Sequence, residues 1–235
     1  GRSAPSLEDV PESRWRVVPN GIDMNRFSPV GRMIGAKDRL LFVGRLVPYK
    51  GVDVLIRALA RFHSAPPLVV AGDGPMRRKL ENLAHTLGVD ARFLGHVPEA
   101  DLPALYRGAR LTILPSVNHQ EAFGIALVES MACGTPVVAS DLPGVADTAR
   151  SGGLIARPGD PEDLSQKIRA ALRPAAVPAG AALSQAIRQS YSWESITKRF
   201  LAVYEEVLAR RGQRTPVQPA AEVTQAAHPR RNAIL

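Results

Sequence analysis

The feature that most constrains the fold is an alternation that runs from residue 39 to about residue 172. Short apolar runs rich in β-branched residues alternate there with longer stretches whose apolar residues recur at helical spacing. The expected strands are 39–44, 67–72, 91–95, 111–115, 136–140 and 153–157. Because these runs are apolar throughout, both faces of each strand should be buried, as in a parallel sheet covered by helices on both sides. The sequence therefore predicts an α/β fold, a doubly wound Rossmann-like parallel sheet of about six strands.

The stretches between the expected strands have the apolar spacing of helices. The predicted helices are 50–62, 76–88, 101–109, 123–134 and 161–172, with an Ala-rich candidate in 174–190 and a long final helix over 193–211. Ser192 is a suitable N-cap for that last helix, and Gly88 is a suitable C-cap for the second. Residues 15–210 are expected to form one domain. Residues 1–14 are expected to be a lead-in linker, and residues 211–235, which lack periodicity, a disordered basic tail.

The composition and charge of the chain limit the kinds of molecule that it is expected to bind. The chain of 235 residues is 45% hydrophobic and 22% charged, as in ordinary globular proteins, and it contains no apolar run of the ~20 residues that span a bilayer. Its net charge is +8, but residues 210–235 contribute +4 of this, and only 5% of residues are aromatic. Nucleic-acid binding is therefore disfavoured. Contact of the basic surface with an anionic membrane remains open, and the lone Cys133 weakly indicates a reducing, cytoplasmic setting.

The loop after the first expected strand carries two cations. Arg45 follows Gly44 at the strand end, and Lys50 stands at the start of the next helix. Free backbone N–H groups and the helix dipole favour an anion at that position, so the spacing suits a diphosphate. A pair of solvated surface charges is the alternative.

The loop after the second expected strand is glycine-rich. Gly72 and Gly74 permit close approach of a ligand to the backbone. Arg77 occupies the third glycine position of a GxGxxG fingerprint, and the loop belongs to the second βα unit. A nicotinamide-dependent oxidoreductase is therefore disfavoured.

The third loop leads into the helix predicted to begin near Phe123. Glu121 lies at the mouth of that helix and Glu129 two turns inside, about 12 Å along the axis. That separation is too large for two carboxylates acting on one bond, but it suits one elongated ligand held at two places. Since carboxylates accept hydrogen bonds from vicinal hydroxyls, sugar rings are indicated. A helix N-terminal charge at Glu121 and a buried, partnered carboxylate at Glu129 are the alternatives.

Taken in chain order, several segments resemble the C-terminal half of the family-4 retaining glycosyltransferases, which have the GT-B fold. The matching segments are VVPNGIDMNRF, FVGRLVPYKGVDVLIRA, VVAGDGPMRRKLENLA, FLGHVPEADLPALY, QEAFGIALVESMACGTPVVAS and GGLIARPGDPEDL. They cover roughly residues 16–172, and EAFGIALVE, which matches the family's Glu-x7-Glu motif, is the most specific. The resemblance implies one half of a GT-B architecture that binds a nucleotide-sugar donor.

The resemblance also implies roles for individual residues. Arg45 and Lys50 would hold the donor diphosphate and offset charge on the leaving group, replacing a divalent metal, so no metal or other cofactor is expected. Glu121 would contact hydroxyls of the donor sugar, and Glu129 those of the ribose. Further donor contacts are implied at Gly44, Gly72, His96, Val97, Phe123, Gly124 and Ile125, with His96 and Val97 beside the base. The donor would be a GDP-sugar or a UDP-sugar, and the acceptor a glycan or a lipid-linked saccharide.

The chain departs from the family pattern in two places. After PVVAS the loop is shortened, with Asp147 where the family has a glutamate. The N-terminal acceptor-binding domain of the family has no counterpart here, so it is expected to be missing or separate, and the 193–209 helix would cross back to it. A non-catalytic nucleotide-sugar-binding module, or one subunit of a split enzyme, is the alternative to a transferase.

Overall fold

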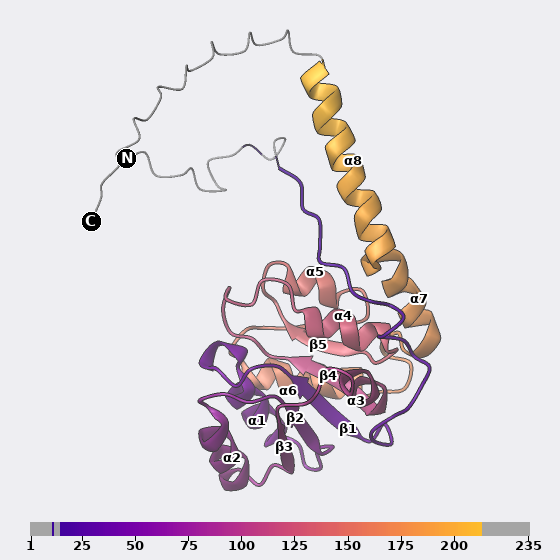
Figure 1. Cartoon of the computed structure of the whole chain (residues 1–235). Coiled ribbons are helices and arrows are strands. Elements are labelled where there is room, and N and C mark those ends of the chain that lie inside the picture. Colours follow the sequence, from indigo (N-terminus) through magenta and orange to yellow (C-terminus); the bar gives the residue numbers. More distant parts are fainter. Residues whose placement is uncertain (1–10, 12–14, 213–235) are drawn as a thin grey trace, which may run out of the picture.

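The structure is a computed structural model that describes residue 11 and residues 15–212 (Figure 1). The predicted linker over 1–14 and the predicted tail beyond residue 212 lie outside these residues, apart from residue 11.

Six parallel strands form one sheet, as predicted. They are β1 (Arg39–Val43), β2 (Leu68–Ala71), β3 (Ala91–Gly95), β4 (Ala109–Leu114), β5 (Val137–Ser140) and β6 (Gly153–Ala156). Their order is β3-β2-β1-β4-β5-β6, with β1 paired in parallel to both β2 and β4. The central strands are almost entirely buried, which explains why their sequences are apolar without alternation.

Helices connect the strands and cover both faces of the sheet. They are α1 (Val52–Leu59), α2 (Arg77–Thr86), α3 (Leu102–Gly108), α4 (Ile125–Ala132), α5 (Val145–Ala149), α6 (Pro161–Ala171), α7 (Gly180–Tyr191) and α8 (Trp193–Gly212), with a 3₁₀ turn η3 at Pro48–Lys50. Since crossovers between parallel strands are right-handed, reversal of the strand order after β3 moves the connections to the opposite face. Accordingly α1 contacts α2 and α6, whereas α4 contacts α3, α5 and α7 (Figure 1).

The predicted elements are confirmed with shifted ends and two additions. The helix expected from Phe123 begins two residues later, at Ile125, and the Ala-rich stretch forms a helix only from Gly180. The 3₁₀ turn η3 and the helix α5 were not predicted, because each is too short to show helical periodicity. Ser192 caps α8 as expected, since its hydroxyl accepts a hydrogen bond from the Ser195 amide at 3.2 Å.

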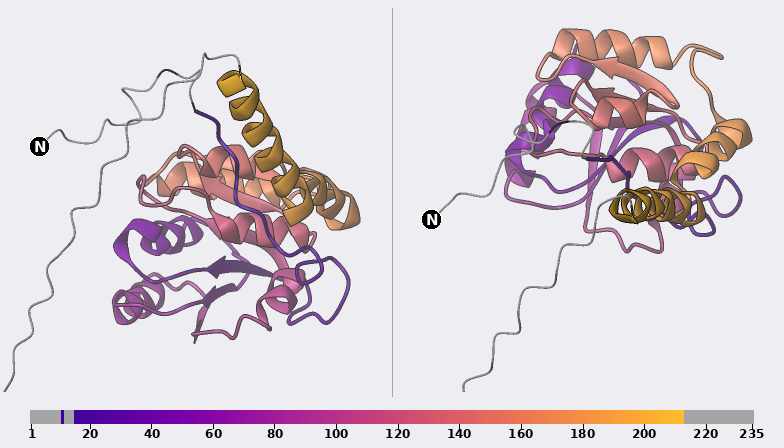
Figure 2. Two further views of the ribbon diagram at one scale, coloured as in Figure 1. Left: turned by 45° about the horizontal axis from the view of Figure 1, so that its top comes forward. Right: turned by 90° about the horizontal axis from the view of Figure 1, so that it is seen from above.

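The last helix, α8, projects away from the sheet (Figures 1 and 2). The segment from residue 15 runs alongside it, and Arg16 pairs with Glu206 at 2.5 Å. Large apolar side chains remain exposed along α8, namely Trp193, Phe200, Leu201, Tyr204, Val207 and Leu208. In the part of the chain that the structure describes, no helix is both long and apolar enough to cross a bilayer.

Candidate functional site

The strand order reverses between β1 and β4, and the loops that leave these two strands meet at their carboxyl ends. The amide of Val117 donates to the carbonyl of Tyr49 at 2.8 Å. Gly51 follows η3 with a φ of +64°, and a Cβ there would lie 2.1 Å from the carbonyl oxygen of Pro115. Only glycine permits this approach. Ligands of doubly wound folds bind in the crevice at such a switch point.

This contact between loops brings together two of the predicted site residues. The Lys50 ammonium lies 2.5 Å from a carboxylate oxygen of Glu121, and their side chains are only 15% and 11% exposed. The hydroxyl of Ser116, which follows β4, lies 3.2 Å from the same oxygen. Glu121 precedes α4, at its mouth as expected, and Glu129 lies inside the helix, which begins two residues later than predicted.

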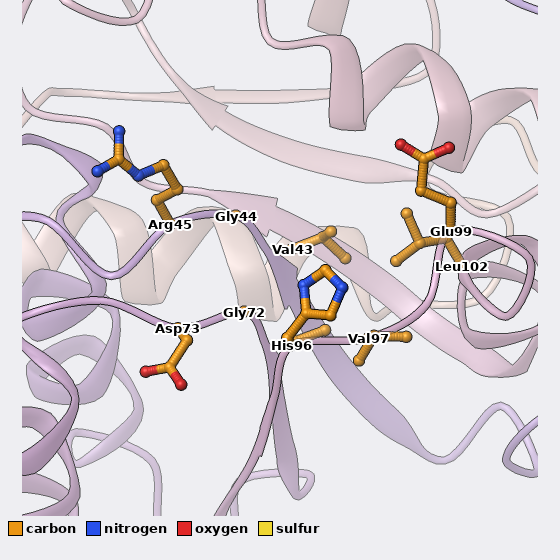
Figure 3. A pocket seen from close by; sticks show the side chains of 10 residues that line it. Val43, Gly44, Arg45, Gly72, Asp73, His96, Val97, Glu99 and Leu102 are labelled. Atoms are coloured by element: carbon orange, nitrogen blue, oxygen red, sulfur yellow. The ribbon is translucent and has the colours of Figure 1, made fainter.

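A pocket of about 330 Å³ opens at the carboxyl ends of β1, β2 and β3 (Figure 3). It is lined by Val43, Gly44, Arg45, Ala71, Gly72, Asp73, His96, Val97, Glu99 and Leu102. Five of these were predicted donor contacts, and the structure brings them together from three separate loops. Arg45 is exposed at the rim, and its guanidinium is directed away from His96 and Val97 (Figure 3).

The floor of this pocket is backbone. Gly72 has a φ of +140°, and a Cβ there would lie 1.9 Å from the carbonyl oxygen of Gly44. The Gly44 amide donates to Ala71 at 3.0 Å, and the Gly72 amide donates to Gly95 at 2.8 Å. These hydrogen bonds hold the three loops together, and the absence of side chains at Gly44 and Gly72 lets a ligand approach the backbone there.

Glu129 is held by a residue of α3. The hydroxyl of Tyr106, in α3, donates to Glu129 Oε2 at 2.8 Å. Burial raises the pKa of Glu129, whereas this hydrogen bond and the charge of Arg26 lower it and Glu99 raises it. Burial, together with the Glu129 charge, also raises the pKa of Tyr106 well above its usual range. Glu129 is thus a largely buried, partnered carboxylate, and it is not among the residues that line the pocket.

The residues at the mouth of α4 are positioned by packing. Gly124 has a φ of +73° and occupies the N-cap position, and Ile125 begins the helix with its side chain 42% exposed. The ring of Phe123 packs against Tyr191 of α7, with ring centroids 6.1 Å apart. Since the Phe123 side chain is used in packing, only its backbone is available to a ligand.

Sequence reasoning missed several residues of this site. Ser116, Glu99 and Tyr106 were not singled out, although Ser116 directly follows a strand and Glu99 lies in the loop after β3. A buried tyrosine hydroxyl needs a hydrogen-bond partner, but the sequence around Tyr106 does not show which residue that partner is. Among residues 11 and 15–212, no three or more His, Cys, Asp or Glu side chains are grouped as a metal site. Independence from metal stays a prediction.

The arrangement can receive one elongated, polar, anionic molecule. Lys50 and the N-terminus of α1 offer positive charge at the switch point, and Arg45 adds a further cation at the rim. The pocket between β1 and β3 offers an apolar slot with backbone groups, and the carboxylates of Glu121 and Glu129 can accept hydrogen bonds from hydroxyls. Such a sheet, with an ionic site at its switch point, is a doubly wound α/β domain with a candidate ligand site at the carboxyl ends of its strands.

Comparison with known proteins identifies the family. The model of the glycosyl transferases group 1 family matches residues 26–189, so the chain belongs to this family. It is 36% identical to a D-inositol 3-phosphate glycosyltransferase of Acidothermus cellulolyticus over 89% of this chain and 52% of that protein. The chain spans about half the length of the curated relatives it matches.

Solved structures show the same fold. A sucrose-phosphate synthase from Thermosynechococcus elongatus superimposes with a TM-score of 0.69 and 27% identity, over 83% of this chain and 53% of that one. Anabaena Alr3699/HepE, solved in complex with UDP-glucose, superimposes with a TM-score of 0.68 and 24% identity, over 81% and 57% of the two chains.

Proposed function

We propose that this chain is the donor-binding, C-terminal half of a retaining glycosyltransferase, which transfers a hexosyl unit from a nucleoside-diphosphate sugar. The observation that carries the proposal is the meeting of Lys50 with Glu121 at the switch point of the sheet, next to the pocket at the ends of β1 to β3. A cation for phosphate, a carboxylate for sugar hydroxyls and a slot for a base then follow one another along one edge of the sheet.

Each residue has a task in this scheme. Lys50 and Arg45 bind the diphosphate and stabilise the negative charge that develops on the leaving nucleotide, which is work that a divalent metal does elsewhere. Glu121 accepts hydrogen bonds from hydroxyls of the donor sugar. Glu129 accepts from the ribose, and the loop of His96 and Val97 meets the base, with either uracil or guanine as candidates.

Donor binding is proposed to separate the Lys50–Glu121 ion pair. Both side chains are mostly buried, and the Ser116 hydroxyl also contacts the Glu121 oxygen that Lys50 binds, so a diphosphate at Lys50 would compete with Glu121 for the ammonium. When a diphosphate reaches Lys50, the Glu121 carboxylate is released at the position where the attached sugar arrives. Retention of anomeric configuration then follows from attack on the same face, assisted by the departing phosphate, and needs no nucleophile from this half.

The acceptor side is proposed to belong to another domain. The chain covers 52% of the Acidothermus relative, and α8 exposes a row of large apolar side chains. Both observations favour an N-terminal acceptor domain, in the same protein or a separate one, that completes the enzyme. A glycan or lipid-linked acceptor places the work in polysaccharide or glycoconjugate synthesis, in the cytoplasm or at the inner face of the membrane. A non-catalytic nucleotide-sugar-binding subunit is the alternative.

Calorimetric titration of the chain with UDP and with GDP tests the proposal. We expect weak binding of at least one nucleotide and a loss of at least tenfold in affinity in Lys50→Gln, because a charge-assisted contact with phosphate is removed. Lys198→Gln is the matched control, since Lys198 is exposed on α8 and pairs with Glu194. Binding of neither nucleotide, or equal affinity in the two variants, would count against the proposed site.

A further inference from the structure

The contact between Tyr106 and Glu129 lies outside the pocket and joins two helices. Tyr106 is completely buried, and its hydroxyl donates to Glu129 Oε2 at 2.8 Å. We propose that Tyr106 is a positioning residue, which fixes one oxygen of the Glu129 carboxylate so that the other is presented to the ribose hydroxyls of the donor nucleotide. This inference rests on the proposed function of Glu129.

The two carboxylate oxygens of Glu129 have different surroundings. Oε2 accepts from Tyr106, whereas Oε1 has no hydrogen bond from any residue that the structure describes. Within those same residues, no fully buried side-chain nitrogen or oxygen lacks a hydrogen-bond partner. It follows that Oε1 reaches solvent and is free to accept from a ligand. One oxygen is anchored and the other is open, as expected of a carboxylate that binds while staying in a fixed orientation.

Tyr106 can fix Glu129 because it is itself fixed at two further points. The Tyr106 carbonyl accepts a hydrogen bond from the Thr135 hydroxyl at 2.7 Å. The rings of Tyr106 and Phe27 pack edge to face, with their centroids 6.2 Å apart. Ser130, next to Glu129, lies 2.8 Å from the Thr112 hydroxyl and 3.1 Å from the Thr135 carbonyl. This buried polar network ties α3, α4 and β4 together and holds the backbone around Tyr106 and Glu129, whereas the Glu129 side chain itself is held by the Tyr106 hydroxyl.

A hydroxyl at this buried position is not needed for packing. A phenylalanine would fill the same space without the desolvation of a polar group. The Tyr106 hydroxyl instead donates a hydrogen bond to the ionised carboxylate of Glu129. This bond lowers the pKa of Glu129 and so opposes the rise that burial causes. The other charged groups that act on Glu129 are Arg26 and Glu99, which form an ion pair with each other at 3.0 Å. The hydroxyl therefore keeps Glu129 able to accept from ligand hydroxyls.

The first test of this inference needs no ligand. The pKa of Glu129 is measured in the whole chain by carbon-13 NMR titration of glutamate carboxyls, with the Glu129 signal assigned from Glu129→Gln. In Tyr106→Phe we expect this pKa to rise relative to the parent chain, because the bond that stabilises the carboxylate is lost. Tyr204→Phe is the control, since Tyr204 is exposed on α8, and it should leave the value unchanged. An unchanged Glu129 pKa in Tyr106→Phe would overturn the inference.

The second test separates positioning from a general effect on the fold. UDP or GDP, whichever binds more tightly, is compared with its 2′,3′-dideoxyribose counterpart by calorimetry. In Tyr106→Phe we expect affinity for the ribose nucleotide to fall about tenfold. Affinity for the dideoxy nucleotide should change less than about twofold, because its ribose hydroxyls are absent.

The outcomes of the second test are distinct. Equal losses for both nucleotides would show that Tyr106 acts on the fold alone and would overturn the inference. If the parent chain bound neither nucleotide, the proposed function and the ribose contact would both fail. The NMR titration would still decide whether Tyr106 controls Glu129.

Discussion

Lys50 and Glu121 neutralise each other at the switch point of the sheet. Each is largely buried, so the ion pair avoids leaving either charge without a partner. In the same arrangement, Glu121 competes with the diphosphate for Lys50, and Lys50 competes with the sugar hydroxyls for Glu121. A nucleoside diphosphate without its sugar would draw Lys50 away and leave the Glu121 carboxylate stranded, whereas a complete donor would satisfy both.

This competition predicts an asymmetric effect of Glu121→Gln. The variant should bind UDP or GDP about fivefold more tightly than the parent chain, since Lys50 is freed and repulsion of the diphosphate is removed. The preference for a nucleotide sugar over the free nucleotide should disappear. Glu194→Gln, which breaks the exposed Lys198–Glu194 pair, is the matched control in calorimetry. Weaker nucleotide binding by Glu121→Gln would contradict the account.

Glu129 predicts a dependence of stability on pH. Its pKa in the folded chain is raised, chiefly by burial, so folding binds protons in the window above the ordinary value of 4.5 and stability falls as the pH rises through it. Glu129→Gln removes this penalty and should be about 1 kcal/mol more stable than the parent at pH 8, but not at pH 4. Urea unfolding at the two pH values measures the difference. A pH-independent gain would contradict the buried charge.

At the residue scale the sequence predicted which charged side chains meet at one edge of the sheet, and their roles in binding stay predictions. Arg45, Lys50 and Glu121 follow strand ends, and in a parallel sheet all such positions meet at one edge. The pairing of Lys50 with Glu121 was not predicted, because it depends on the close approach of Gly51 to Pro115. Tyr106 carries no local signal that separates it from an ordinary core residue. Its role depends on which helix lies beside it.

At the scale of elements, the glycine loop after β2 should tolerate substitution poorly, because it packs closely against the loop after β1. Gly72→Ala should lower the free energy of unfolding by roughly 3 kcal/mol or more, since its Cβ would meet the Gly44 carbonyl. Gly88 also has a positive φ, +65° against +140° at Gly72, but open space surrounds its new Cβ, so Gly88→Ala is expected to lose only about 1 kcal/mol. Denaturant unfolding of both variants compares them. Equal losses would mean that backbone conformation matters and the close approach does not.

Prediction of elements succeeded where burial imposed a clear pattern and failed where it did not. The six strands are short, mostly apolar runs, so their existence and order along the chain could be predicted to within a few residues. The start of α4 was placed too early, because Phe123 is apolar and continues the helical pattern, although it packs against α7 from the preceding loop. α5 has five residues, fewer than two helical turns, and gives no periodic signal.

At the scale of the whole molecule, the apolar side of α8 is exposed. Leu201 and Leu208 are 53% and 65% exposed, in a row with other large apolar side chains. Apolar surface of this kind favours association, so the isolated chain should self-associate at high concentration. Leu201→Lys/Leu208→Lys should lower the weight-average mass in sedimentation experiments and leave nucleotide affinity unchanged.

The matched control for this prediction is Thr197→Lys/Ala202→Lys, which adds the same charge at exposed positions of α8 that lack large apolar groups. It should leave the weight-average mass close to that of the parent chain. Equal dissociation by both variants would point to charge repulsion, and absence of self-association in the parent chain would contradict the expectation. The sequence predicted an apolar stripe on this helix, left partly exposed where the helix would cross to another domain, and the exposure of Phe200, Tyr204 and Val207 agrees with this.

The most direct measurement is a crystal structure of this chain with a bound UDP- or GDP-sugar. We predict that the diphosphate lies at the switch point against Lys50 and Arg45, with the Lys50–Glu121 contact opened and Glu121 facing the sugar. The ribose should meet Glu129, and the base should occupy the slot beside His96 and Val97. A ligand bound elsewhere, or an intact Lys50–Glu121 pair beneath the bound diphosphate, would contradict the account.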